Sequence, residues 1–210
     1  VSYWLYNQKP FVVTVTLEVN TRNLKTATTN LRQYIFSRVL QGHQRVKVLE
    51  LQPINIYQKI WYGEAFYWTP GNMLALHQED IVYQYPYADG DYFPIVQGFG
   101  GGYSHSDASQ YAVDFAMPIG TPIHAARSGI VIDLVEHQTR GGASRKYAKY
   151  ANYLVILHSD DTTGEYYHLR KNGVAVIQGE HVTAGQIIGY SGDTGFSSLP
   201  HLHFAVYHAK

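Results

Sequence analysis

Two histidines near the C-terminus, His201 and His203, have the spacing in this chain best suited to chemistry. Ala205-Val206-Tyr207 follows them and favours a β-strand, on which side chains two residues apart share one face. Leu202 and Phe204 would then point to the opposite face, into a core. Two adjacent imidazoles can supply a metal ligand and a neighbouring acid/base group, or they can be surface histidines on an edge strand. Their partners elsewhere in the chain decide between these interpretations.

Three further residues are candidate partners. Asp114 stands between two alanines in an alternating, strand-like segment, where small neighbours leave room for a group to approach the carboxylate. His105 lies nine residues earlier in a loop-like segment that could fold back to it, and His168 ends a second strand-like segment. Two imidazoles and a carboxylate would leave a tetrahedral zinc ion one open position, which is the ligand count of a catalytic site. The two remaining histidines could move protons or stabilise an oxyanion. A histidine-rich β protein without a metal is the other interpretation.

The composition restricts the classes of function. The 210 residues include 45% hydrophobic ones, enough for a core, and a formal net charge of zero without a basic stripe, so nucleic acid is not expected as a partner. No cysteine occurs, which excludes thiolate ligands, a cysteine nucleophile and disulfides. No apolar run approaches the roughly 20 residues of a transmembrane helix. The chain begins at Val1 rather than Met, as expected if an upstream signal or anchor is removed. The oligomeric state has no signature in the sequence.

The first half of the chain predicts β-structure. Residues 11–19 and 45–51 alternate between apolar and polar types with period two, which is typical of half-buried strands. Residues 31–40 fit either a short helix or a strand. Residues 1–85 are therefore predicted to form a smaller β-sandwich-like domain, and no cluster of acid/base or metal-binding residues stands out within it.

The second half predicts an all-β domain with glycine-rich corners. Residues 86–95 combine proline, glycine and acidic residues and are expected to be a linker, followed by a domain at 96–210. Residues 138–149 are polar and basic and predict an exposed loop, and 179–189 predict a hairpin. The glycine run at 98–102 lacks the lysine and the strand–helix context of a phosphate loop, so nucleotide binding is not expected.

Segments of this second half also resemble, in order, the lysostaphin/LytM-type zinc metalloendopeptidases of the M23 peptidase family. They are Ser104-His105, Tyr111-Ala112-Val113-Asp114-Phe115-Ala116-Met117-Pro118, Gly120-Thr121-Pro122, Tyr166-Tyr167-His168-Leu169, Gly185-Gln186-Ile187-Ile188-Gly189, Gly192-Asp193-Thr194-Gly195 and Pro200-His201-Leu202-His203-Phe204. The resemblance covers roughly residues 96–208. It implies an antiparallel β-sheet peptidase domain with a groove, of the duplicated-hybrid-motif type. It further implies hydrolysis of peptide bonds in bacterial peptidoglycan, and a location in the cell envelope, periplasmic or secreted.

The resemblance also implies a role for each candidate residue. By position, His105, Asp114 and His203 would bind Zn²⁺, and His168 and His201 would be the catalytic pair. Lysostaphin itself has a short His-x-x-x-Asp spacing, whereas eight residues separate His105 from Asp114 here. The alternative is a non-catalytic module that binds the cell wall or activates a hydrolase, which an intact set of five residues disfavours. A biotinyl- or lipoyl-like carrier would need an acceptor lysine at a hairpin tip, and none is placed there.

Three tyrosines and the remaining histidines are expected to lie outside the set of catalytic and metal-binding residues. Tyr103, Tyr166 and Tyr190 could line a groove, and His158, at the end of a predicted strand, could lie behind the site. The histidines for which no catalytic role is expected are His43, His77, His124, His137, His181 and His208.

Overall fold

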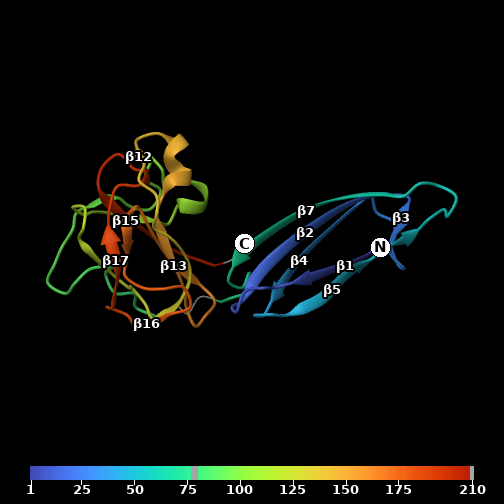
Figure 1. The fold of residues 1–210 in the computed structure, drawn as a ribbon, viewed down its shortest axis with the longest axis horizontal. Coiled ribbons are helices and arrows are strands. Elements are labelled where there is room, and N and C mark those ends of the chain that lie inside the picture. The colour runs from blue at the N-terminus through green and yellow to red at the C-terminus, as the bar shows by residue number, and fades with distance from the viewer. Residues whose placement is uncertain (77–79, 209–210) are drawn as a thin grey trace. The chain divides into compact units, whose positions relative to one another are not determined.

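The computed structural model of the protein describes residues 1–76 and 80–208 (Figure 1). Contacts between Cα atoms divide it into two units, Val1–Ala75 with His208 and Leu76–Tyr207. Nearly all its elements are strands, which confirms the all-β class; the helices in the described residues are two 3-10 helices, η1 (Asp107–Ser109) and η2 (Arg145–Tyr150). No helix there is long and apolar enough to cross a membrane.

The first unit is built around β2 (Val13–Arg22), which pairs antiparallel with β4 (Gln33–Leu40) on one side and β7 (Trp61–Pro70) on the other. The predicted alternation is present, because Val13, Val15, Leu17 and Val19 are all buried. Residues 31–40, which fitted a helix or a strand, supply β4. The remaining strands of this unit form two antiparallel pairs, β1 (Ser2–Tyr6) with β5 (Arg45–Glu50) and β3 (Leu24–Lys25) with β6 (Gln52–Pro53). That this unit is a β-sandwich stays a prediction.

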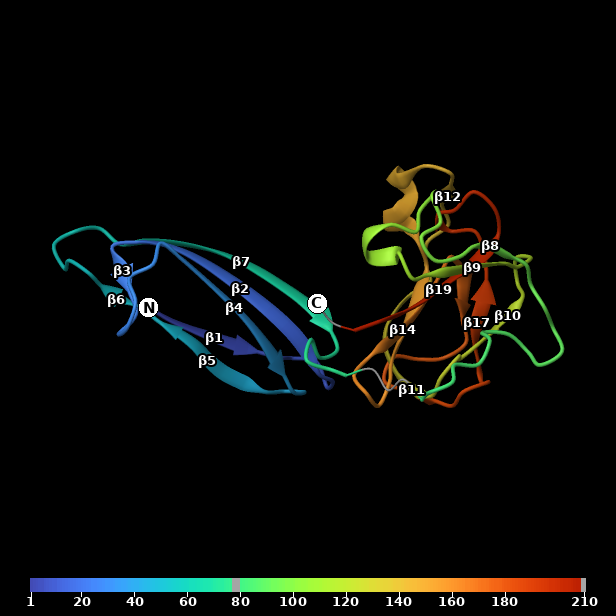
Figure 2. The same cartoon turned by 180° about the vertical axis from the view of Figure 1, so that it is seen from behind.

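The second unit contains a seven-stranded antiparallel sheet in which β19 lies between β14 and β9 (Figure 2). In spatial order its strands are β16 (His181–Val182), β11 (Gly129–Val135), β13 (Tyr153–Leu157), β14 (Thr163–Tyr167), β19 (His201–Tyr207), β9 (Val113–Ala116) and β8 (Ile95–Gln97). A second sheet joins β10 (Pro122–His124), β17 (Ile187–Ser191) and β15 (Leu169–Val174), and the short strands β12 (Gly141–Gly142) and β18 (Gly195–Phe196) pair in parallel.

The register of the seven-stranded sheet separates core from site. Leu154, Tyr166, Phe204 and Val113 form one row across four strands, and all four belong to or pack against the apolar core. Tyr166 is fully buried, and its hydroxyl accepts a hydrogen bond from the Ala126 backbone N–H at 2.8 Å. The expectation that Tyr166 lines a groove is therefore wrong, because side-chain alternation along β14 turns it into the core.

The segment 179–189 also differs from its prediction as a hairpin. Its two strands do not pair with each other: β16 pairs with β11, whereas β17 pairs with β10 and β15. The turn between them, residues 183–186 with one glycine, Gly185, carries the chain from one sheet to the other. The domain limits 1–85, 86–95 and 96–210 stay predictions; Tyr83, Tyr87 and Phe93 pack against the core of the second unit.

Candidate metal centre

The first pair of candidate residues is held by strand register. On β19 and β9, His203 lies directly opposite Asp114, and His203 Nδ1 donates to Asp114 Oδ1 at 2.8 Å. The row continues across the neighbouring strands, with Tyr167 opposite His203 and Gln97 opposite Asp114. This row lies on the face opposite the core row. The sheet therefore places a carboxylate and an imidazole together without help from any loop.

His105 reaches the same carboxylate from the glycine-rich loop. Its backbone N–H donates to the Gly101 carbonyl at 3.1 Å, and its ring Nδ1 donates to the Gly98 carbonyl at 2.8 Å. The ring Nε2 lies 3.1 Å from Asp114 Oδ1. Gly101 packs against Gln97, since a Cβ there would lie 2.2 Å from Gln97 Cγ. The eight residues between His105 and Asp114 therefore allow the loop that carries His105 to fold back over strand β9.

The donor set that results fits a metal ion. His105 Nδ1 must carry the proton because a carbonyl oxygen only accepts, so Nε2 of the neutral ring presents a lone pair to Asp114. That Nε2 is buried and has no hydrogen-bond partner. A buried lone pair facing a carboxylate oxygen is unfavourable unless a cation lies between them. Ligand atoms of His105, Asp114 and His203 all lie within 4.8 Å of one another, as a metal ion requires.

The electrostatics of Asp114 favour its ionised form. Burial raises the pKa of this carboxyl group, but the hydrogen bond from His203 and the nearby imidazoles of His201 and His105 together lower it by more. The net result is a pKa below the ordinary value of 3.8. Asp114 is therefore a carboxylate at neutral pH, which is the protonation state that binds a metal.

His168 lies beside this set on a strained piece of backbone. It stands between β14 and β15 with φ of 68°, a left-handed conformation that non-glycine residues seldom adopt. Its Nδ1 donates to the Thr194 carbonyl at 2.6 Å. Burial, together with the neighbouring His201, lowers the pKa of His168 to about 3. The ring is thus neutral at pH 7, with Nε2 as an acceptor.

His201 stacks near His168, with their ring centroids 4.5 Å apart. Its Nδ1 donates to the Leu199 carbonyl at 2.8 Å and lies 3.2 Å from Ser197 Oγ, which itself donates to Asp193 Oδ1. Its Nε2 lies 3.8 Å from Asp114 Oδ2. His168 and His201 therefore each donate a hydrogen bond from Nδ1 to a backbone carbonyl, and Nε2 of each ring stays available near the Asp114 carboxylate.

The structure thus gathers all five residues singled out from the sequence: His105, Asp114, His168, His201 and His203. Three of them can hold a metal ion, and two imidazoles beside it can accept or donate protons. Their individual roles as ligands and catalysts stay predictions.

Several residues that support this arrangement were missed from the sequence. Gln97 Nε2 donates to Asp114 Oδ2 at 3.3 Å and to Ser104 Oγ at 2.7 Å. Asn152 is fully buried; its side-chain amide donates to the Leu169 carbonyl at 3.2 Å, and its backbone N–H donates to Thr194 Oγ1 at 2.9 Å. These bonds hold Leu169, which follows His168, and Thr194, whose carbonyl accepts from the His168 ring. The buried position of Asn152 between apolar strand residues could have indicated such a role.

Four of the histidines expected to have no catalytic role have no contact with the site among the described residues. No hydrogen bond or ring contact among the described residues connects His43, His124, His137 or His181 with the five, and His77 lies outside the described residues. His158 is buried as well, but its Nδ1 partner is the Ser128 carbonyl and its ring neighbour is Tyr83. His158 therefore does not lie behind the five candidate residues.

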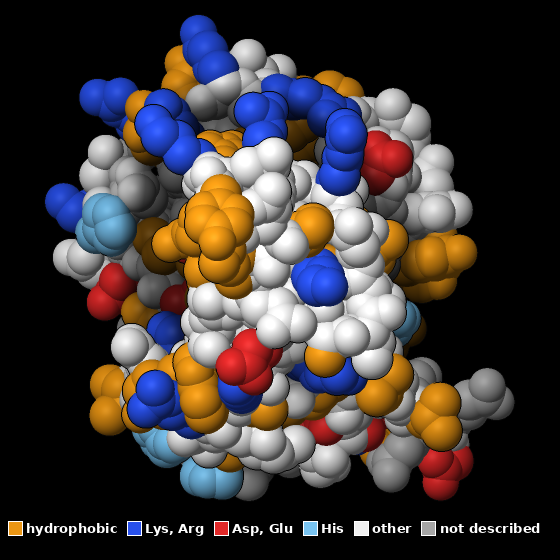
Figure 3. Space-filling model, turned by 90° about the vertical axis from the view of Figure 1, so that its right-hand side faces the viewer, with side chains coloured by type: hydrophobic (Ala, Val, Ile, Leu, Met, Phe, Trp, Pro, Cys, Tyr) orange, Lys and Arg blue, Asp and Glu red, His pale blue; other side chains and the backbone are white. Residues whose placement is uncertain are grey.

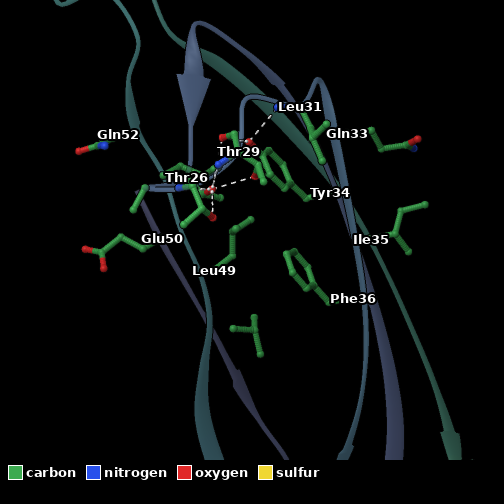
Figure 4. Close-up of a pocket in the computed structure, with 14 residues that line it drawn as sticks. Thr26, Thr29, Leu31, Gln33, Tyr34, Ile35, Phe36, Leu49, Glu50 and Gln52 are labelled. Carbon is green, nitrogen blue, oxygen red and sulfur yellow. Dashed lines mark hydrogen bonds between the residues drawn. The ribbon is translucent and has the colours of Figure 1, made fainter.

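A pocket of about 700 Å³ in the first unit offers no comparable chemistry (Figure 4). Threonine hydroxyls lie at its centre, and Thr26 Oγ1 and Thr29 Oγ1 bond to each other at 2.8 Å. Glu50 is its single carboxylate, and it pairs with Lys47. Exposed aromatic side chains such as Trp61 and Phe66 occur in the same unit, and apolar side chains are visible on the surface in Figure 3.

Comparisons with known proteins identify sequences similar to this chain. The profile described as Peptidase family M23 matches residues 108–210, a range that contains four of the five candidate residues but not His105. Lysostaphin of Staphylococcus simulans is 37% identical over 132 residues, which are 62% of this chain and 23% of that protein. The peptidoglycan DD-endopeptidase ShyA of Vibrio cholerae is 39% identical over 97 residues, 46% of this chain and 20% of that protein.

A solved structure of the catalytic domain of lysostaphin from Staphylococcus simulans is 32% identical, covers 60% of this chain and 76% of that chain, and has a TM-score of 0.36. The chain spans about a quarter of the length of the first curated relatives it matches. The antiparallel sheet and its donor set define a β-sheet domain able to bind a metal ion. With the sequence matches, they place the matched region, residues 108–210, in the M23 peptidase family.

Proposed function

We propose that this protein is a zinc endopeptidase that hydrolyses peptide bonds in the stem or cross-link peptides of bacterial peptidoglycan. The proposal assigns His105, Asp114 and His203 as zinc ligands and His168 and His201 as catalytic residues. The observation that carries it is the buried, unpartnered His105 Nε2 facing the ionised Asp114 beside His203. The peptidoglycan substrate is supported by the name of the relative ShyA.

Zinc suits the donor set, since two imidazoles and one carboxylate leave a position open for water in tetrahedral coordination. Bound there, zinc would supply Lewis acidity toward a carbonyl and a water of lowered pKa. Calcium and magnesium prefer sets of oxygen ligands, which this site lacks.

The chain's own residues supply the proton transfers. In the neutral rings of His168 and His201, Nε2 is the nitrogen with the lone pair, because each Nδ1 donates to a backbone carbonyl. One ring takes the proton of the attacking water and returns a proton to the leaving amine, and the other donates to the tetrahedral oxyanion once protonated. Asp193 and Ser197 hold the His201 ring in its orientation from behind.

The test separates metal binding from turnover. Zinc-loaded protein should release new amino groups and muropeptides from purified peptidoglycan, as measured by amine assay and mass spectrometry. His203→Ala should lose zinc, whereas His201→Ala should keep zinc and lose turnover by at least about 10²-fold, the typical cost of one transition-state donor. His181→Ala, an exposed histidine, should change neither. Full metal content and activity in His203→Ala would overturn the ligand assignment.

The non-catalytic alternative gives a different result in the same experiment. A module that only binds the cell wall or activates a hydrolase would load zinc and release nothing. A peptidoglycan hydrolase must also meet its substrate outside the cytoplasmic membrane, so the proposal includes a location in the cell envelope, periplasmic or secreted. Fractionation of the source cells that found the protein solely in the cytoplasm would contradict that location.

A further inference from the structure

The chain is neutral as a whole, with 16 basic and 16 acidic residues, yet the loops beside the candidate site are strongly basic. Six exposed cations lie there, and five of them are here called the basic rim: Arg140, Arg145, Lys146, Lys149 and Arg170; the sixth is Lys171. The two segments that carry them, 137–159 and 166–179, contain no Asp or Glu. The local charge therefore differs from that of the rest of the chain.

Backbone hydrogen bonds fasten this rim to the loop that orients the catalytic histidines. The Arg140 carbonyl accepts from Gly195 N–H at 2.8 Å, and the Gly142 carbonyl accepts from Ser197 N–H at 3.2 Å. These contacts are part of the parallel pairing of β12 with β18. The residue before Gly195 is Thr194, whose carbonyl holds His168. The segment that carries Arg140 is therefore hydrogen-bonded to the loop that contacts both catalytic rings.

Tyrosine rings, not carboxylates, contact four of the five cations of the rim. Arg140 and Lys149 each lie over the Tyr150 ring, at 5.2 Å from its centroid, and Lys146 lies 5.1 Å from that of Tyr147. Arg170 stacks on the Tyr190 ring at 4.6 Å. None of the five forms an ion pair with a carboxylate among the residues that the structure describes. Cation–π contacts orient Arg140, Lys146, Lys149 and Arg170 and leave their positive charge uncompensated.

From these observations we propose that the basic rim selects peptides that carry free carboxylates near the cleaved bond, in preference to uncharged peptides. The inference rests on the proposed function and names the substrate class of the same site. The rim's guanidinium and ammonium groups are suited to carboxylates, and charges gathered beside a site raise the local concentration of an oppositely charged ligand.

The experiment compares two synthetic peptides of one sequence, one with side-chain carboxylates and one with the same groups as carboxamides. Binding is measured on zinc-loaded His201→Ala protein by fluorescence anisotropy, so that it does not depend on cleavage. Cleavage is measured as kcat/KM on the protein with His201 intact. The test variant carries Arg145→Gln, Lys146→Gln and Lys149→Gln on η2, and the matched control carries Arg22→Gln, Lys25→Gln and Arg38→Gln in the first unit.

The protein with an intact rim should bind and cleave the carboxylate peptide about 10-fold better than the carboxamide, given that each exposed charge pair contributes roughly 1.5- to 5-fold. The η2 variant should lower this ratio below about twofold, and 0.5 M salt should do the same by screening. The control variant should keep the ratio. Equal treatment of the two peptides by the intact protein, or an unchanged ratio in the η2 variant, would overturn the inference.

Failure of the proposed function leaves a different pattern. Carboxylate-selective binding that requires the rim, without cleavage of either peptide, would support the inference and refute the endopeptidase. Rim-dependent binding of polyphosphate with no discrimination between the two peptides would show a general polyanion surface and would also overturn the inference.

Discussion

A substitution of Gln97 tests whether strand β8 orients the carboxylate of the proposed metal centre. Its side-chain amide donates to Asp114 Oδ2 at 3.3 Å, while Oδ1 of the same carboxylate faces His105 and His203. Replacement by leucine keeps a similar volume and removes the donor. The carboxylate would then lack a hydrogen bond that fixes its rotation, although every ligand stays in place.

The expected cost follows from the role of this hydrogen bond. Partners of metal-binding carboxylates typically change metal affinity by about 10- to 100-fold when mutated. The bond is long, at 3.3 Å, and the carboxylate keeps its hydrogen bond with His203. We therefore expect a loss of metal affinity at the lower end of this range. Gln97→Leu should weaken zinc binding by about 10-fold, or about 1.4 kcal/mol. Gln97→Glu should weaken it more, because a second carboxylate would face Asp114.

The assay is a competitive zinc titration against a chromogenic chelator, with thermal melts of the metal-free proteins to establish equal folding. Ser104→Ala is the matched control, since it removes the other acceptor of the Gln97 amide and leaves its donation to Asp114. Zinc affinity of Gln97→Leu within twofold of the unmodified protein would refute the idea that strand β8 prepares the carboxylate.

Three further predictions concern the stability of the second unit. Removal of zinc with a chelator should lower the melting temperature and its return should restore it, with about 2.7 kcal/mol expected at a zinc concentration 100 times Kd; no shift would argue against a bound metal. Tyr166→Phe should reduce the free energy of unfolding in urea by about 1–3 kcal/mol because the buried Ala126 N–H loses its acceptor, whereas the exposed Tyr111→Phe should change little. Burial, more than the nearby positive charge of an arginine, lowers the pKa of His158, so below about pH 6.5 the unfolded chain binds a proton that the folded chain does not. Stability should therefore fall with decreasing pH by up to about 1.4 kcal/mol per unit from this group, and urea unfolding of His158→Gln at pH 7.5 and 5.5 should show a smaller loss, with His181→Gln as the unchanged control.

The sequence alone predicted the strand that forms β19, and it singled out five residues that the structure brings together, because short-range patterns mark them. Alternation along the chain turns His203 to one face and Leu202 to the other, and the same rule marks Asp114 between small neighbours. The grouping of Gln97 and Tyr167 with them depends on register between strands far apart in the chain, which no local pattern encodes.

The fate of a glycine-rich segment likewise depends on tertiary contacts. Turn residues in 179–189 predicted a hairpin, but a turn says only that the chain reverses, and the flanking strands found better partners in two different sheets. The glycines at 98–102 showed flexibility in the sequence. In the fold they allow a close approach to Gln97 and present two carbonyls to His105.

A comparison of two histidines shows what separates a metal site from a structural residue. His105 and His158 are both buried, both donate from Nδ1 to a backbone carbonyl, and both have an Nε2 without a hydrogen-bond partner. Around His158 Nε2 the space is provided by Gly164, where a Cβ would lie 2.9 Å away, so the neutral ring is simply packed. Around His105 Nε2 stands the ionised Asp114, and the same lone pair becomes costly unless a cation is present. A buried histidine with an unpartnered Nε2 is therefore not by itself evidence of a metal site. The evidence is the carboxylate of Asp114, which the register of the sheet places next to His105.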